Sequence, residues 1–288
     1  MNHRSTVIPD WWDAVLRRVL GLPALDGTIL RDVVPSLEHL STFLNAVDER
    51  SGRPSRYMQQ RQLRETYLLY YSTANLLKPL WVLEQLWPDG PPTGPAPLRV
   101  LDLGCGPGTG IAALFAWTER HPHGRPLVVE GIDASEANAA LYRRVGEEIG
   151  AITGRAISCS ARQGDAATPA GEAASRELVM ALNLLNEIPE KKHVAFLSRW
   201  EELLVPGGVL LLVEPALRAT SRALLRLRDH AVQEGWQVRV PCFRQADCPA
   251  LLSEKDWCHH DLPWERPPYI EWLDEAVGNV KRSLKFSC

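Results

Sequence analysis

Residues 98–120, LRVLDLGCGPGTGIAALFAWTER, place three glycines between a short apolar run and an amphipathic segment. The apolar run predicts a buried strand, and the segment after the glycines predicts a helix. Gly104, Gly106 and Gly108 permit a tight turn between the two and let backbone N–H groups approach a ligand closely. This order of elements favours an α/β fold with a ligand site at the end of the strand.

The chain beyond this loop alternates short apolar runs with helical segments, which is typical of a parallel α/β sheet. We expect strands at residues 98–104, 126–135, 156–166, 177–188, 206–215 and 236–241, with SLKFSC at the C-terminal end as a seventh strand beside the sixth. Right-handed crossovers would join them into a Rossmann-like, doubly wound sheet.

Composition divides the chain into four parts. Residues 1–90 predict a helical N-terminal subdomain, in which Pro79 is expected to kink or interrupt a long aromatic-rich helix. Residues 91–97 are a Pro/Gly linker, residues 98–240 the Rossmann-like domain, and residues 241–288 a Cys-rich lobe with the last strand. We expect the lobe as an insert in the hairpin between the sixth and seventh strands.

Two carboxylates follow the next two strands. Asp133 lies at the end of the second strand, 25 residues beyond Gly108, and Asp165 lies at the end of the third strand. A carboxylate at the position of Asp133 can accept both ribose hydroxyls of an adenosine. Asp165 would then lie beside the adenine ring.

The series LDLGCGPG, GIDAS, QGDA and PGG resembles the class I S-adenosylmethionine-dependent methyltransferases over residues 98–240. The resemblance implies S-adenosylmethionine as the cofactor. It places Gly104, Gly106 and Gly108 around the methionine moiety, Asp133 on the ribose and Asp165 by the adenine. Asp102 would approach the methionine ammonium, and capping of a buried turn is the alternative role for it.

The segment NLLNEIP after the fourth strand lies where such enzymes place residues that face the transferred methyl group. Methyl transfer from a sulfonium requires mainly that the protein position the nucleophile in line and exclude water. Asn183, Asn186 and Glu187 are therefore candidates for orienting or deprotonating the nucleophile. The alternative is that Asn186 and Glu187 cap or flank the next helix.

Three of the six cysteines, Cys242, Cys248 and Cys258, lie close together in the sequence and are followed directly by His259–His260. Thiolates are natural ligands of zinc and iron–sulfur clusters, although this spacing lacks the C-x-x-C knuckle of common zinc modules. Cys288 on the expected seventh strand is the candidate fourth ligand, with one of the two histidines as the substitute. A Pro-rich loop with buried thiols is the alternative.

A narrower resemblance rests on TYLLYYSTANLLK, LNLLNEIP, LVEPA, PCFRQADCP, DWCHH and KFS in this order. Together they resemble the methyltransferase-like assembly factors of the mitochondrial small ribosomal subunit and their bacterial relatives. The resemblance implies a 4Fe–4S cluster on Cys242, Cys248 and Cys258, for which zinc is the alternative. It also implies the small ribosomal subunit or its rRNA as the partner.

Three functions stay open. A methyltransferase acting on rRNA predicts a continuous basic face beside the glycine loop, to which the arginines at 222, 226, 228, 239 and 244 would contribute. A small-molecule methyltransferase predicts a closed apolar pocket roofed by helices around Tyr67, Tyr70 and Tyr71. A non-catalytic assembly factor would bind the cofactor or the cluster structurally. The net charge of −3 gives no general attraction to nucleic acid.

No stretch of the sequence has the roughly 18 continuous apolar residues that a membrane span requires, so we expect no membrane partner. The first twenty residues show no basic region followed by an apolar run, and they carry Asp10 and Asp13, which fit poorly with a transit peptide. We expect a cytoplasmic protein, whose thiols stay reduced unless a metal holds them.

Overall fold

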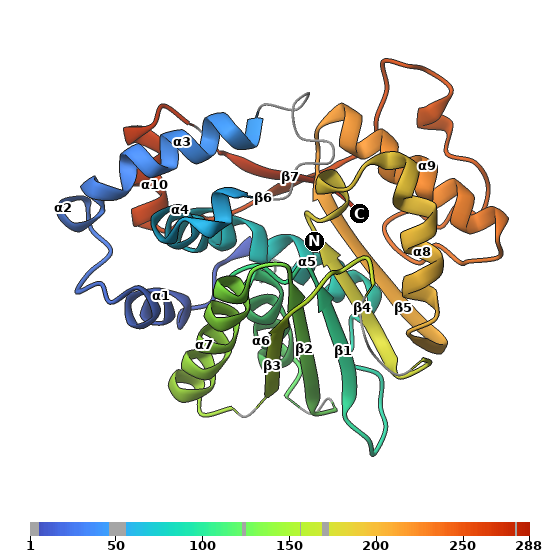
Figure 1. The fold of residues 1–288 in the computed structure, drawn as a ribbon, viewed down its shortest axis with the longest axis horizontal. Coiled ribbons are helices and arrows are strands. Elements are labelled where there is room, and N and C mark those ends of the chain that lie inside the picture. The colour runs from blue at the N-terminus through green and yellow to red at the C-terminus, as the bar shows by residue number, and fades with distance from the viewer. Residues whose placement is uncertain (1–5, 46–55, 123–124, 156, 169–172, 280) are drawn as a thin grey trace.

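A seven-stranded sheet lies at the centre of the structure, a computed structural model that describes residues 6–45, 56–122, 125–155, 157–168, 173–279 and 281–288. Within these residues the strand order is β3-β2-β1-β4-β5-β7-β6 (Figure 1). The strands are β1 (Leu98–Leu103), β2 (Leu127–Asp133), β3 (Ser158–Gln163), β4 (Arg176–Leu182), β5 (Leu204–Pro215), β6 (His260–Pro263) and β7 (Ser283–Ser287). Strands β1 to β5 are parallel, and β7 pairs antiparallel with β5 and β6. The expected Rossmann-like, doubly wound sheet is confirmed.

The order of the strands reverses at β1, which pairs with β2 on one side and with β4 on the other. In an open α/β sheet the crevice outside the carboxyl ends of such strands is where ligands bind. The glycine loop, Asp133 and the segment NLLNEIP all follow strands at this point. The topology therefore gathers most of the expected site residues at one edge.

Helices cover both faces of the sheet. Helices α6 (Thr109–Arg120) and α7 (Glu136–Thr153) pack on one face, and α8 (His193–Glu201) and α9 (Arg218–Gln233) pack on the other (Figure 1). Neighbouring residues of β1 point to opposite sides, because Val100 belongs to the core under α6 and Leu101 to the core under α8 and α9. This explains why the strand has apolar residues on both faces, at four of its six positions.

The N-terminal part is helical, as expected. It contains α1 (Trp12–Leu20), α2 (Gly27–Leu30), α3 (Val34–Asn45), α4 (Arg61–Thr66), a π-helical turn (Tyr67–Ser72) and α5 (Thr73–Leu86). Helix α1 packs on α7, and α5 packs on α6. The fully buried Trp12 donates its indole N–H to Thr73 Oγ1 at 2.9 Å. The helical part and the sheet thus share one hydrophobic core.

The expected interruption of the helix at Pro79 was wrong, and the expected kink stays a prediction. Helix α5 runs through Pro79 without a break from Thr73 to Leu86. Proline in a helix interior costs about 3 kcal/mol or more. Leu76, Leu80 and Leu83 are fully buried on both sides of it, and packing of this kind outweighs local propensity.

The expected sixth strand at residues 236–241 was also wrong, because these residues form no strand. Instead, the Gln245 side chain forms both backbone hydrogen bonds of Val238. It accepts the Val238 N–H at 3.0 Å and donates to the Val238 carbonyl at 2.7 Å. The sixth strand is β6, which follows the cysteines, so the Cys-rich segment precedes the last hairpin rather than lying within it. The expected seventh strand is confirmed as β7.

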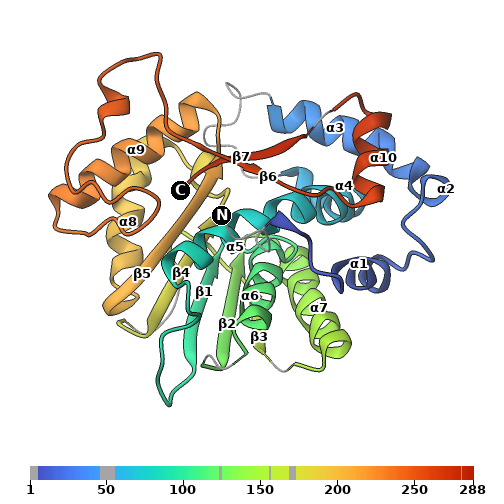
Figure 2. The same ribbon diagram turned by 180° about the vertical axis from the view of Figure 1, so that it is seen from behind.

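Between β6 and β7 the chain forms a helix that the sequence reasoning missed, α10 (Pro268–Ala276). It packs on α2, and its Asp274 accepts a short hydrogen bond from the Tyr70 hydroxyl. Seen from behind, β6 and β7 lie alongside α5 (Figure 2), where Trp81 contacts both His260 and Phe286. None of the helices in the described ranges has the length and apolar character that a membrane crossing requires.

Candidate cofactor and acceptor site

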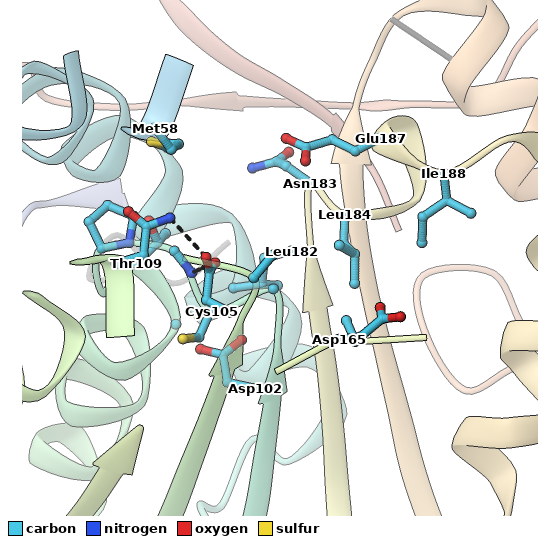
Figure 3. A pocket seen from close by; sticks show the side chains of 18 of the residues that line it. Met58, Asp102, Cys105, Thr109, Asp165, Leu182, Asn183, Leu184, Glu187 and Ile188 are labelled. Carbon is cyan, nitrogen blue, oxygen red and sulfur yellow. Dashed lines mark hydrogen bonds between the residues drawn. The ribbon is translucent and has the colours of Figure 1, made fainter. Parts of the chain in front are cut away.

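A pocket opens at the carboxyl ends of β1, β2 and β4 (Figure 3). It encloses about 900 Å³ including its open mouth. Seven of the nine expected cofactor and catalytic residues line it: Asp102, Gly104, Gly106, Asp133, Asp165, Asn183 and Glu187. Gly108 and Asn186 do not. Figure 3 shows Asp102 below Cys105 at one end, and Asn183 beside Glu187 at the other.

The glycine loop has the backbone that only glycine adopts without strain. The φ angles are +64° at Gly104, +54° at Gly106 and +121° at Gly108. A Cβ on Gly104 would come within 2.8 Å of Leu184, and one on Gly108 within 3.0 Å of Val145. Gly104 and Gly106 therefore shape the pocket wall, whereas Gly108 lets α6 approach α7.

Asp133 closes the pocket at the end of β2. Its carboxylate accepts hydrogen bonds from Gly106 N at 2.9 Å, Ser135 N at 2.8 Å and the Asn138 side-chain amide at 3.0 Å. Burial raises the pKa of this carboxyl, and the three donors oppose that shift. A carboxylate offers about four lone-pair sites. Acceptor capacity therefore remains for the ribose hydroxyls that the resemblance assigns to Asp133.

Asp102 carries a buried carboxyl without a partner. Neither oxygen has a hydrogen-bond partner, and the nearby Tyr142 hydroxyl lies outside hydrogen-bonding geometry. A Cβ on Gly110 would come within 2.1 Å of Asp102 Oδ2, so the carboxyl lies against the first turn of α6. Burial raises the pKa of Asp102 to about 7. The alternative role as a cap of the turn is thus wrong, and the free acceptor suits a bound ammonium.

Asn183 lies at the opposite end of the pocket in a left-handed conformation, with φ at +55°. Its Oδ1 is buried and has no partner, while its side chain hydrogen-bonds the Tyr67 hydroxyl. Non-glycine residues held in this backbone region are strained, and such strain clusters at functional sites. Asn183 therefore lines the pocket and carries a buried amide oxygen without a hydrogen-bond partner.

Glu187 lines the pocket beside Asn183. Burial raises the pKa of the Tyr67 hydroxyl, and the charge of Glu187 raises it further. Asn186 turns away, and its backbone N–H donates to Glu214 at 3.2 Å. Neither of them caps the next helix, because no side chain caps the turn at Glu190–Lys192 or α8. Only the capping part of that alternative is wrong, because Asn186 and Glu187 do lie directly before the next helical turn.

Asp165 lies in the same pocket, where its Oδ1 accepts the Ala167 N–H at 2.9 Å and shapes the loop after β3. Phe196 from α8 and Ile188 supply apolar surface near it. Three residues line the pocket although they lie outside the motifs found in the sequence: Met58, Asn138 and Phe196. Tyr67, expected as part of a roof, does line the pocket, whereas Tyr70 is buried against Asp274.

The comparisons with known proteins identify the family of this chain. The profile of the family described as mitochondrial small ribosomal subunit Rsm22 matches residues 92–276, which is more than half of the 288-residue chain. The chain belongs to the Rsm22 family. No curated protein matches the sequence.

Several solved structures are similar to this Rsm22-family chain. One is an S-adenosylmethionine-dependent methyltransferase from Mesorhizobium loti, with 21% identity over 48% of this chain and 53% of that one, and a TM-score of 0.32. Another, from Geobacter sulfurreducens in complex with S-adenosylhomocysteine, has 22% identity over 48% of each chain and a TM-score of 0.34. The YcgJ protein from Bacillus subtilis has 16% identity over 72% and 79%, with a TM-score of 0.38. The chain spans about half the length of the first two.

Two thiols of the Rsm22-family chain have a raised pKa, Cys258 in the Cys-rich segment and Cys288 after β7. The pKa of the Cys258 thiol is raised by burial and by the neighbouring thiols of Cys248 and Cys242. The pKa of the Cys288 thiol is raised to about 12, mainly by burial and in addition by the Cys258 thiol. Even so, no group of three or more His, Cys, Asp or Glu residues arranged to hold a metal ion occurs in the described part of the chain. Of the two candidate histidines, His260 packs against Trp81 at 4.7 Å between ring centroids.

Helix α9 anchors this segment through side chains that were expected to form a basic edge. Arg222 donates to the carbonyl oxygens of Ala250, Ser253 and Asp256 at 3.2, 2.7 and 2.7 Å. Its neighbour on the helix, Arg226, pairs with Glu190. These two arginines are held by internal partners, which reduces their availability for a continuous basic face.

Proposed function

We propose that this Rsm22-family chain is an S-adenosylmethionine-dependent methyltransferase that acts on a component of the small ribosomal subunit. The observation that carries the proposal is the unpartnered, buried carboxyl of Asp102 beside the positive-φ glycine loop and Asp133. Glycine N–H groups, an acceptor for an ammonium and an acceptor for ribose hydroxyls are the groups that this cofactor requires. Family membership supports the ribosomal acceptor.

S-adenosylmethionine, when bound, supplies an electrophilic methyl group on a sulfonium. The chain contributes position and charge. Asn183 Oδ1 is free to accept a hydrogen bond from an N–H or O–H nucleophile, and Glu187 beside it can take up the proton that the nucleophile loses. Tyr67 holds Asn183 from the N-terminal helices. Positioning of this kind is the main requirement of methyl transfer.

The test has two stages. Titration calorimetry with S-adenosylhomocysteine is expected to show binding to the wild-type protein and to Asn183→Ala and Glu187→Gln alike. Transfer of labelled methyl from S-adenosylmethionine to small ribosomal subunits is expected to fall by about a hundredfold or more in both variants, as for loss of a general base and its orienting partner. Binding without any transfer would favour the non-catalytic assembly factor. Transfer to small molecules alone would favour a biosynthetic enzyme.

We further propose that Cys242, Cys248 and Cys258 hold an iron–sulfur cluster, with Cys288 as the fourth ligand. The type of donor supports this, because thiolates are natural cluster ligands and all four cysteines are free thiols. A zinc ion is the alternative occupant. Iron, sulfide and zinc contents of anaerobically purified protein should be compared between wild type and Cys242→Ser. Cys159→Ser, outside the segment, is the control and should retain any metal. Metal that is absent from the wild type, or that survives in Cys242→Ser, would contradict the proposal.

A further inference from the structure

The turn that carries Glu187 begins without a cap of its own. It is a 3-10 turn, Leu185–Glu187, and the residue before it, Leu184, has an apolar side chain that cannot accept a hydrogen bond. The first N–H groups of a helical turn have no acceptor within the turn. Buried N–H groups are nearly always paired, so the acceptor has to come from another part of the fold.

Glu214, near the C-terminal end of β5, supplies both acceptors. Its Oε1 accepts the N–H of Leu185 at 2.8 Å, and its Oε2 accepts the N–H of Asn186 at 3.2 Å. The parallel pairing of β4 with β5 ends at Val213, whose carbonyl accepts the Asn183 N–H at 2.7 Å. The carboxyl group thus extends the contact between the two strands into the turn that follows β4.

His193, the first residue of α8, binds the same turn through its carbonyl groups. The Nε2 atom lies 3.0 Å from the Leu185 oxygen and 3.0 Å from the Ile188 oxygen. Because both partners are carbonyl oxygens, Nε2 carries the proton and donates it to them. The turn is therefore fixed at its N–H groups by Glu214 and at its carbonyl groups by His193.

Both side chains are buried, with exposed fractions of 0% for Glu214 and 4% for His193, and neither is among the described residues that line the pocket. Burial raises the pKa of Glu214 to about 8, and the backbone N–H groups oppose that shift. Carboxyl groups with a strongly raised pKa cluster at functional sites. What the turn contributes to such a site is Glu187, which lies beside Asn183 in the pocket (Figure 3).

We propose that Glu214 is a positioning residue of the methyl-transfer site, and that His193 supports it. Glu214 fixes the turn so that the Glu187 side chain faces the nucleophile, and it touches neither the acceptor nor the cofactor. A misplacement of about 1 Å can lower a rate by about a hundredfold. The inference deepens the proposed function and rests on it for the reaction, whereas the hydrogen bonds of the turn can be measured independently.

Glu214→Gln tests the proposal with little change in side-chain size. The amide nitrogen cannot accept a hydrogen bond, so one of the two backbone N–H groups loses its acceptor. In methyl transfer to small ribosomal subunits, kcat is expected to fall by about tenfold or more, with an unchanged KM for S-adenosylmethionine. Affinity for S-adenosylhomocysteine should also be unchanged. Equal kcat in the variant and the wild type would overturn the inference.

Asp274→Asn is the matched control. Asp274 is also fully buried, and its carboxyl accepts hydrogen bonds from the Tyr70 hydroxyl and from Arg266. The control should lower the Tm, as Glu214→Gln does, but should keep the wild-type kcat. An equal loss of kcat in the two variants would reduce the effect to general destabilisation and would overturn the inference.

A double-mutant cycle shows whether Glu214 acts through Glu187. If it does, Glu214→Gln should cause no further loss of kcat when Glu187 is already replaced by Gln. Additive losses would show that the two residues act separately, which would contradict a positioning role.

His193 keeps the proposal testable if Glu214→Gln does not fold. His193→Gln places an amide donor near the position of Nε2, whereas His193→Asn places it near the position of Nδ1. His193→Gln should therefore retain most of the wild-type kcat, and His193→Asn should lose about tenfold or more. Equal kcat in these two variants would overturn the inference.

Amide hydrogen exchange supplies a readout that does not depend on activity. Exchange at Leu185 and Asn186 should be faster in Glu214→Gln and unchanged in Asp274→Asn, and equal exchange in both would contradict the contact itself. A wild-type protein that binds S-adenosylhomocysteine but transfers no methyl group would overturn the proposed function, and with it the role of Glu214 in transfer. Wild-type transfer that Glu214→Gln performs equally well would overturn the inference alone.

Discussion

The backbone N–H of Gly106 donates a hydrogen bond to Asp133 Oδ2 at 2.9 Å, which joins the loop after β1 to the end of β2. The same carboxylate accepts the Ser135 N–H and the Asn138 amide. Two adjacent strand ends are thus fixed before any ligand enters. Such preorganisation reduces the cost of ordering the loop on binding.

Asp133→Asn should weaken S-adenosylhomocysteine binding by about tenfold or more. The carboxylate has two acceptor oxygens for its hydrogen-bond donors, whereas the amide has only one. The stability should also fall by about 1–3 kcal/mol, since a buried N–H loses its partner. Calorimetry and urea unfolding measure the two effects. Glu136→Gln, an exposed neighbour, is the control. Equal affinity in the two variants would contradict this role.

The pKa of Asp102 predicts a pH dependence. Burial raises it to about 7 from an ordinary value of about 3.9. Between these values the folded protein keeps a proton that the unfolded chain has released, so this carboxyl lowers stability as the pH rises from about 4 to about 7. Asp102→Asn should remove this loss of stability. The loss amounts to a few kcal/mol, because a shift of one pKa unit corresponds to about 1.4 kcal/mol. Urea unfolding of both proteins between pH 4 and 8 tests it.

The same carboxyl should couple binding to pH. A bound ammonium favours the ionised form, so wild-type affinity for S-adenosylhomocysteine should increase as the pH rises toward about 7. Asp102→Asn should bind more weakly and with a flatter profile. Parallel profiles for the two proteins would show that Asp102 does not meet the ammonium.

Two glycines with similar backbone conformations allow the effect of backbone strain to be separated from the effect of a side-chain clash. Gly104 and Gly154 have φ angles of +64° and +68°, but only Gly104 has a neighbour that a Cβ would meet, Leu184 at 2.8 Å. Alanine at either position should cost about 1–2 kcal/mol for the left-handed conformation. Gly104→Ala should in addition abolish S-adenosylhomocysteine binding, while Gly154→Ala should retain it. Calorimetry and thermal unfolding of both variants decide whether the loop has this role.

Arg222 and Arg226 allow a similar comparison for the Cys-rich segment. Arg222→Met removes hydrogen bonds to three carbonyls, which should destabilise residues 242–258 locally by about 2 kcal/mol or more. Arg226→Met removes a half-exposed ion pair with Glu190, which contributes about 0–1 kcal/mol. Hydrogen exchange and the rate of thiol modification at Cys258 should increase in the first variant only. Equal rates would show that α9 does not hold the segment.

Much of the candidate site could be predicted because its parts follow strands. The loop at Gly104–Gly108, Asp133 and Asn183 each come directly after an apolar run, and a parallel sheet brings the carboxyl ends of its strands together whatever lies between them. Strands β1 to β5 and helices α6 and α7 were predictable for the same reason, since hydrophobic period and turn glycines are local signals.

The sequence by itself therefore determined the sheet, the glycine loop and the carboxylates at its edge. Only the tertiary structure decided the last strands and the surroundings of the pocket. The Gln245 side chain forms the backbone hydrogen bonds at Val238 that a neighbouring strand would form. The Tyr70 hydroxyl donates to Asp274, which lies 204 positions further along the chain. No local pattern encodes such pairs, because the free energy of each contact depends on two distant segments that meet only when the core has formed.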